Sequence, residues 1–211
     1  MIYKIFLKYV MKINNILKVT ILKIIKCDII GKGGMMNLED ILCNNNILDS
    51  INNNLNFLLE LIPELKDMIG FLHKHPHHHL DVWNHTLYAL SLSENDFEIR
   101  LCLLLHDVGK PHCFTEGEVR HFKGHPSKSA IMSKNILERL GYDEEFIKRI
   151  CYLIEFHDTP ITSSEVEENF ELQYKRYLIQ KCDALAHHPN KLEKRNEYLD
   201  ATNKLLKKFC G

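Results

Sequence analysis

The chain has 211 residues, of which 45% are hydrophobic, and its formal net charge is -1. This length and composition suit one compact domain with a substantial core. The near-neutral charge excludes the broad basic field that binding to duplex DNA requires. Thirteen histidines are the unusual feature of the composition.

Seven cysteines are scattered along the chain, and no two of them form a C-x-x-C pair. An odd number of cysteines inside apolar helical patterns is typical of reduced, mostly buried thiols. A disulfide framework or a zinc ribbon would need paired spacings. We therefore expect a cytoplasmic protein.

The first 36 residues differ from the rest because Ile, Lys, Leu and Asn dominate them. No run of 18 residues there lacks a lysine, which argues against a membrane-spanning helix. Wound as a helix, the segment gathers most of its lysines in one sector, as in a basic amphipathic tail. Alternatively, the string GKGG could be encoded by a ribosome-binding sequence, and the segment would be a translated leader ahead of a start at Met35 or Met36. Both interpretations stay open, no membrane partner is expected, and residues 37–211 are predicted to form the functional domain.

From residue 37 onward, apolar positions recur at helical spacing, and no Val- and Thr-rich alternation indicates a strand. Asp81, Asp96 and Asp143 stand where helix N-caps are expected, and Gly141 stands at a helix end. Residues 71–80 are predicted to form a loop. The predicted helices span about residues 47–61, 63–70, 81–92, 96–106, 127–141, 143–157, 163–188 and 190–209. The chain is therefore expected to be an all-α helical bundle.

The string CLLLHDVGKP places a His-Asp doublet where a strongly apolar run stops. A lone histidine at a helix end is more often structural, because it suits the helix dipole. Here other histidines and an aspartate also interrupt or edge apolar faces, where an unpaired imidazole or carboxylate would be costly. The set comprises His85, His106, Asp107, His125, His157 and Asp183. A shared metal centre would satisfy all of them.

Imidazole and carboxylate ligands without thiolates suit first-row divalent ions such as Mn, Fe, Co, Ni or Zn, and suit Mg less well. Inward-facing ligands from separate helices are a known way of building such a centre. Adjacent residues on a helix point about 100° apart. His106 and Asp107 can therefore share an ion only at the end of their helix, which Gly109 permits.

The ordered set His85, His106-Asp107 and Asp183 resembles the signature of the HD superfamily, which consists of all-α metal-dependent phosphohydrolases. The strings HHHLDVWNHTLYAL, LCLLLHDVGKP, HFKGHPSKSA and LIEFHD resemble more narrowly the HD domain at the C-terminal end of some bacterial tRNA nucleotidyltransferases. This resemblance covers about residues 66–188. Nothing upstream offers the Gly-rich strand-turn or the D-x-D carboxylates of a nucleotidyltransferase palm domain, so CCA addition is not expected.

The resemblance implies a division of the metal ligands into two sets. His125 and His157 match histidines that help to hold a second metal in some branches, with the Asp107 position as the bridge. The superfamily's ligands of the principal metal are matched by His85, His106, Asp107 and Asp183. One or two divalent ions are therefore expected.

Hydrolysis of a phosphate ester or phosphodiester is the activity that the resemblance implies, with Asp107 at its centre. A bound ion would acidify a water molecule and polarise a phosphoryl oxygen. Lys110 occupies the place of a lysine available to substrate phosphate, and His78 matches a histidine that is a candidate substrate contact. His121 would neutralise phosphoryl charge or donate a proton, unless it is an ordinary loop histidine.

The expected substrate is a small phosphorylated molecule, most simply a nucleotide, and the lack of a GYP string argues against cyclic di-GMP. The alternative is a binding module that holds metal and a nucleotide or an RNA end with little turnover. The complete ligand set favours the enzyme. His73 is expected to lie in a surface loop, and His187 to end a helix without a role in the site.

Overall fold

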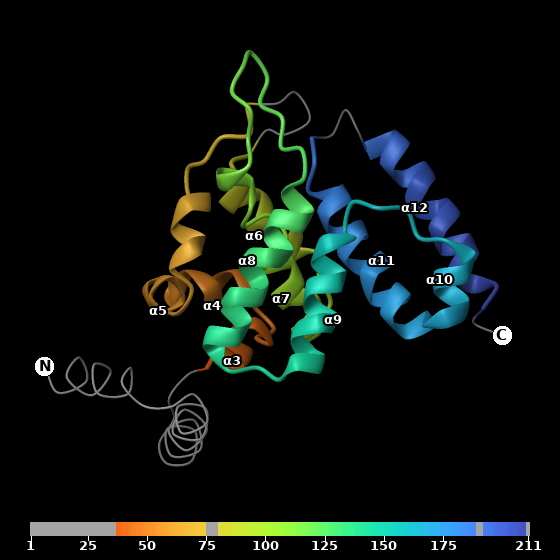
Figure 1. Cartoon of the computed structure of the whole chain (residues 1–211), viewed down its shortest axis with the longest axis horizontal. Helices are drawn as coiled ribbons and strands as arrows, with labels where there is room; N and C mark the ends of the chain where they lie inside the picture. Colours follow the sequence, from red (N-terminus) through yellow and green to blue (C-terminus); the bar gives the residue numbers. More distant parts are fainter. Residues whose placement is uncertain (1–36, 75–79, 189–191, 210–211) are drawn as a thin grey trace, which may run out of the picture.

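The computed structural model describes residues 37–74, 80–188 and 192–209, which form an all-α fold (Figure 1). Within these ranges the only β-type pairs are the isolated bridges Leu72–Asp81 and Thr115–His121. The helices are α3 Leu38–Leu42, α4 Ile47–Asn53, α5 Leu55–Leu61, η1 Pro63–Met68, α6 Val82–Ser91, α7 Phe97–Leu105, η2 Lys110–His112, α8 His125–Leu140, α9 Glu144–Glu155, α10 Ser163–Glu168, α11 Phe170–Leu185 and α12 Leu192–Lys207, where η marks a 3-10 helix. The predicted fold class is confirmed. The alternatives for residues 1–36, and His78, lie outside the described residues.

Aspartate side chains begin three of the helices, as the sequence predicted. Asp81, Asp96 and Asp143 each accept a hydrogen bond from the backbone N–H three residues later, at 2.6, 3.0 and 2.9 Å. This contact satisfies one of the amide groups that a helix start leaves without an intrahelical partner. Gly141 ends α8 with a φ of 76°, a conformation that glycine adopts without strain.

Two predicted helices are each divided into two by an asparagine. The segment 47–61 breaks at Asn54, whose side chain donates to Ser50 O, and 163–188 breaks at Asn169, whose Oδ1 accepts from Leu172 N. Asparagine side chains compete with the helical backbone for hydrogen bonds, which explains both breaks. In addition, α3 was not predicted.

Helix α7 lies at the centre of the molecule, where it packs against α3, α6, α9 and α11 (Figure 1). Every residue from Ile99 to Leu105 is buried. A helix that is buried on all sides ends inside the protein. The doublet His106-Asp107 is therefore fully buried at the end of α7, although both residues are polar.

The first helices of the described chain, α3 and α4, belong to the same core as α7. α3 packs against α7, and α4 packs against α6.

In the part of the chain that the structure describes, no helix is both long enough and apolar enough to cross a membrane.

Arg176 on α11 fixes the segment that follows α9. Its guanidinium is completely buried and donates to the carbonyl oxygens of Phe156 and Thr159 at 3.0 and 2.6 Å, and to Glu165 Oε1 at 2.9 Å. Hydrogen bonds from a charged donor are the stronger kind. The backbone on both sides of His157 is thereby held against α11.

Gly109 lets the start of α8 approach the doublet. Its φ is -80°, so the position does not need glycine for its backbone conformation. A Cβ atom built there would lie 2.6 Å from the backbone N of Ser129 and 2.9 Å from its Oγ, which already accepts a hydrogen bond from Gly109 N. Glycine is therefore required by close packing, whereas the sequence indicated only a helix stop.

Replacing Gly109 with Ala should lower the free energy of unfolding by about 1–3 kcal/mol, because a methyl group is forced against backbone atoms. Urea denaturation followed by circular dichroism measures this change. Adding Ser129→Ala should not restore stability, since the Ser129 backbone N remains. If Gly109→Ala were as stable as the wild type, this would show that α8 can move away from residue 109 without cost.

Candidate metal centre

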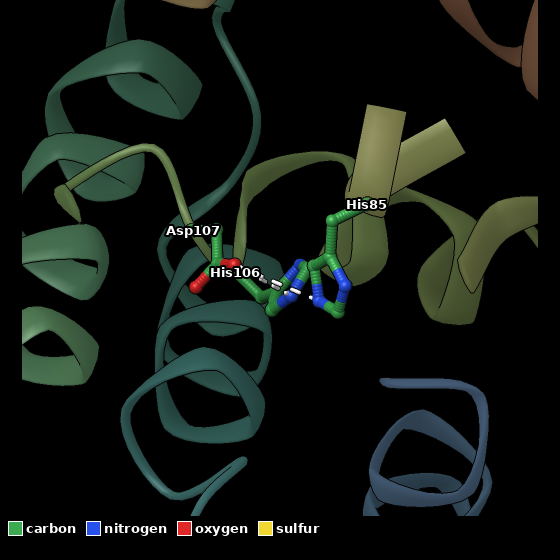
Figure 2. A group of neighbouring side chains, drawn as sticks. All are labelled: His85, His106 and Asp107. Carbon is green, nitrogen blue, oxygen red and sulfur yellow. Dashed lines mark ion pairs between the residues drawn. The ribbon is translucent and has the colours of Figure 1, made fainter. Parts of the chain in front are cut away.

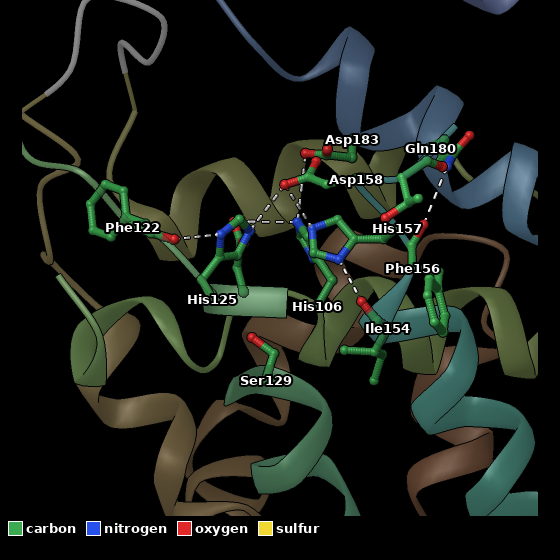
Figure 3. Close-up of polar contacts among 12 residues, drawn as sticks. His106, Phe122, His125, Ser129, Ile154, Phe156, His157, Asp158, Gln180 and Asp183 are labelled. Carbon is green, nitrogen blue, oxygen red and sulfur yellow. Dashed lines mark hydrogen bonds and ion pairs between the residues drawn. The ribbon is translucent and has the colours of Figure 1, made fainter. Parts of the chain in front are cut away.

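All six predicted metal ligands lie together at one end of the bundle. His85 lies on α6, His125 is the first residue of α8, and Asp183 lies on α11, while the other three follow the ends of α7 and α9. Each of the six is at most 9% exposed. Figure 2 shows His85, His106 and Asp107 pointing toward one another. Figure 3 shows His106 and His157 near Asp183, and His125 near Asp158.

The first set of donor atoms surrounds Oδ2 of Asp107 and Oδ1 of Asp183. His106 Nε2 lies 3.3 Å from the former and 3.6 Å from the latter, and His85 Nε2 lies 3.8 and 2.8 Å from them. Two atoms bonded to one ion at about 2.1 Å are roughly 3–3.5 Å apart at octahedral or tetrahedral angles. The spacing of these four donors is close to that of ligands sharing an ion.

A second set lies on the other oxygen of Asp107. Oδ1 is 3.3 Å from His125 Nε2, and ligand atoms of Asp107, His125 and His157 all lie within 4.8 Å of one another. Asp158 adds a carboxylate oxygen 3.4 Å from His125 Nε2 and 3.7 Å from His157 Nε2 (Figure 3). The two oxygens of Asp107 thus face different donors, and His157 also lies within 4.8 Å of ligand atoms of His106 and Asp183.

Backbone carbonyl groups orient the imidazole rings. A carbonyl oxygen only accepts hydrogen bonds, so each Nδ1 in these contacts carries a proton and each Nε2 faces the cluster. Such contacts are how metal-binding histidines are usually held. The Nδ1 contacts are His85 to Ala186 O at 3.2 Å, His106 to Leu103 O at 2.7 Å, His125 to Phe122 O at 3.0 Å and His157 to Ile154 O at 2.6 Å.

Three buried polar atoms of the cluster make no hydrogen bond within the described part of the chain. They are His106 Nε2, Asp107 Oδ1 and His125 Nε2. A buried polar atom without a partner costs about 1–3 kcal/mol. All three atoms lie where a divalent ion would meet them, so the residues present fit a metal ion of the first transition row.

Electrostatics in the metal-free cluster favour a charged His106. Burial opposes the charge, but Asp107 and Asp183 outweigh burial and raise the pKa of His106 to about 10. Burial also opposes ionisation of Asp107, yet the charges of His106 and Lys110 hold the pKa of this carboxyl well below its usual range. A divalent ion would replace the proton of His106, since a ligand must be deprotonated to bind metal.

Burial keeps His125, in the second set of donors, neutral. It lowers the pKa of His125 to about 4, although Asp107 attracts a proton to that ring. A neutral imidazole is the form that binds metal. His125 can therefore accept an ion near neutral pH without releasing a proton.

The predicted catalytic residues Lys110 and His121 differ in how deeply they are buried in the site. Lys110 is 5% exposed, and its Nζ donates to Asp107 Oδ2 at 2.7 Å and to His73 Nε2 at 3.3 Å. His121 is exposed. A cavity of about 220 Å³ connects them and is also lined by Phe122, His125, His157 and Asp158.

Two expectations about other histidines were wrong. His73 is buried, not on the surface, because its Nδ1 donates to Leu80 O at 2.9 Å and its ring packs edge-on against His85. His187 is also buried and lies close enough to His85 and Asp183 to share an ion with them. The sequence gives no signal for His73, whereas His187 lies one helical turn after Asp183 and so shares its face.

Asp158 was not recognised as a candidate ligand. The string LIEFHD contains a second His-Asp doublet, His157-Asp158, at the end of α9, and this repetition of the first doublet was the available signal. Its carboxylate is about half exposed, in contrast to Asp107, so it lies at the mouth of the cavity.

Comparisons with known proteins agree with this geometry. The HD domain family model matches residues 77–206. The chain is 32% identical over 131 residues to the A-adding tRNA nucleotidyltransferase of Deinococcus radiodurans and 36% identical over 104 residues to the CC-adding tRNA nucleotidyltransferase of Thermus thermophilus. These matches cover 58% and 46% of this chain but only 30% and 24% of the two relatives.

Replacing Asp107 with Ala should weaken metal binding at least about 100-fold, because both donor sets lose their shared carboxylate. Elemental analysis of the purified protein measures the loss, and circular dichroism should still show a helical fold. The variant also leaves Lys110 buried without its carboxylate, so a second variant, Asp107→Ala with Lys110→Met, should recover stability but not metal. Asp200→Ala, on the exposed face of α12, is the control. Wild-type metal content in Asp107→Ala would contradict this assignment.

Proposed function

The chain belongs to the HD domain family, whose members are generally metal-dependent phosphohydrolases, and we propose that its His-Asp cluster hydrolyses a phosphate ester or phosphodiester. The substrate class that we propose is a small phosphorylated molecule, a nucleotide in the first instance. Residues 37–211 are proposed as the functional domain, because α3 and α4 pack on the same core as the matched region.

The observation that carries the proposal is the pair of donor sets around Asp107. A buried carboxylate with His106 near Oδ2 and His125 near Oδ1 is arranged to bridge two ions. A site that only recognised a nucleotide would not need a second set of imidazoles. We therefore propose His85, His106, Asp107 and Asp183 as ligands of a principal ion, and His125 and His157 as ligands of a second.

A divalent ion at such a site lowers the pKa of a water molecule and polarises a phosphoryl oxygen. Lys110 is held beside Asp107 at the floor of the cavity, where its ammonium can neutralise charge on the phosphoryl group. His121 lines the cavity from an exposed position, where its imidazole can donate a proton to the leaving group. His78 is proposed as a further substrate contact because of its position in the sequence.

The names of the relatives support a nucleotide as substrate. Both are tRNA nucleotidyltransferases, but the chain spans less than a third of their length. Their activity as whole proteins is therefore not proposed for this chain. Any of Mn, Fe, Ni, Co, Zn or Mg is compatible with the nitrogen and oxygen donors, with Mg the poorest match.

Reduced thiols support a cytoplasmic location. The described cysteines are all free. Burial raises the pKa of Cys151 and Cys182 to about 11, so both remain unreactive thiols near neutral pH.

The alternative function is a module that binds metal and a nucleotide or an RNA end with little turnover. A screen of nucleotides and phosphodiesters against protein loaded with Mn, Ni or Co distinguishes the two. Metal-dependent release of phosphate or of a nucleoside, absent from Asp107→Ala prepared in parallel, supports the enzyme. A metal-replete protein that binds nucleotides but cleaves none of these esters supports the binding module instead.

Replacing His125 or His157 with Ala should lower the metal content from about two ions per chain towards one, because both residues belong to the donor set on Oδ1 of Asp107. Activity should fall by orders of magnitude while the first ion is retained. Metal counting under saturating conditions, together with kcat and KM, measures both effects. A single ion in the wild type, unchanged in the variants, would show that these histidines shape the substrate pocket instead.

A further inference from the structure

Five of the six arginines of the chain have charged or hydrogen-bonding partners. Arg139, Arg149 and Arg176 pair with Glu64, Glu98 and Glu165. The remaining two are Arg100, which donates to Leu42 O, Asn44 O and Asn95 Oδ1, and Arg120, which donates to Glu116 and Leu72 O. These guanidinium groups are structural.

Arg195 is different, since no group in the described ranges accepts a hydrogen bond from it or forms an ion pair with it. It is the fourth residue of α12 and is half-buried. Its side chain lines the same cavity as Asp158, Asp183 and His187. An arginine that faces a metal-binding cavity without a carboxylate partner is suited to bind an anionic ligand.

We propose that Arg195 forms a second anion subsite, which binds a phosphate group of the substrate other than the one that reacts. The substrate would then carry two phosphate groups, either joined as a diphosphate or placed on separate hydroxyls. This inference rests on the proposed function for the position of the reacting phosphate.

The other cations of the cavity are already engaged. Lys110 Nζ contacts Asp107 and His73, which keeps it at the metal-binding floor. Arg120 is held between the rings of Phe71 and Phe114, 4.7 and 4.8 Å from their centroids, in addition to its hydrogen bonds. Among the cations of the described residues that line the cavity, Arg195 therefore remains available for a further phosphate.

The placement of Arg195 on α12 separates it from Lys110 in the chain and in the cavity wall. α12 packs against α11, which carries Asp183, whereas Lys110 follows the doublet. Arg195 and Lys110 thus line the cavity from different elements of the fold.

Binding of three adenosine ligands to the metal-loaded protein tests the subsite. The ligands are the 5'-monophosphate, the 5'-diphosphate and the 3',5'-bisphosphate, used as phosphorothioate analogues that resist hydrolysis, and calorimetry gives their Kd values. The wild type should bind at least one two-phosphate ligand about tenfold or more tightly than the monophosphate. Tighter binding of the 5'-diphosphate would show that the two phosphates are joined, and tighter binding of the 3',5'-bisphosphate would show that they are on separate hydroxyls.

Arg195→Gln should abolish this preference and leave the Kd of the monophosphate within about twofold of its wild-type value. Lys204→Gln removes an equal charge from an exposed position on the same helix and should retain the preference. Equal affinity for all three ligands in the wild type, no binding of any, or a preference that survives Arg195→Gln would each overturn the subsite.

The test of the subsite and the test of the proposed function can give different results. A preference that depends on Arg195, in a protein that cleaves no phosphoester, supports the subsite and refutes the enzyme. Metal-dependent hydrolysis without such a preference supports the enzyme and refutes the subsite.

Discussion

Burial of the Asp107 carboxylate is the constraint on which the rest of the site depends. An ionised carboxylate without partners inside a protein costs several kcal/mol, and Asp107 is completely buried at the end of the central helix. In the metal-free protein, Lys110 Nζ at 2.7 Å and the charged ring of His106 offset this cost. A divalent ion held by these residues would take over the same role and repel Lys110. The ammonium of Lys110 would then gain free energy by facing an anion, which would connect metal binding to phosphate binding.

The donor atoms meet because several helices end or begin around the end of α7. His125 begins α8, His157 follows α9, and the absence of a side chain at Gly109 lets the backbone of α8 approach the doublet. Arg176 holds the backbone around His157 against α11. Carbonyl oxygens at helix ends have no intrahelical partners, so they are free to orient imidazole rings. The same irregular ends that interrupt the helices therefore supply the geometry of the centre.

Much of this arrangement could be predicted from the sequence because its determinants are local. Asp96 caps α7, and the apolar run after it shows that the helix is buried and that His106 ends it. The burial of His73 could not be predicted in this way, because its ring packs against His85 and contacts Lys110, which lies 37 residues further along the chain. The breaks at Asn54 and Asn169 depend on a competition between side-chain and backbone hydrogen bonds that the apolar periodicity does not report.

The charges in the cavity imply an order of binding. Among the described residues, the carboxylates of Asp107, Asp158 and Asp183 are roughly balanced by Lys110, Arg195 and the proton on His106. Arg120, which also lines the cavity, is paired with Glu116, so no strong field attracts a phosphate without metal. An ion that replaced this proton would make the cavity positive, and a second ion would make it more so, because His125 would bind as a neutral ring. Phosphate affinity should therefore arise from metal loading, and the ligands of the ions decide substrate binding as well as chemistry.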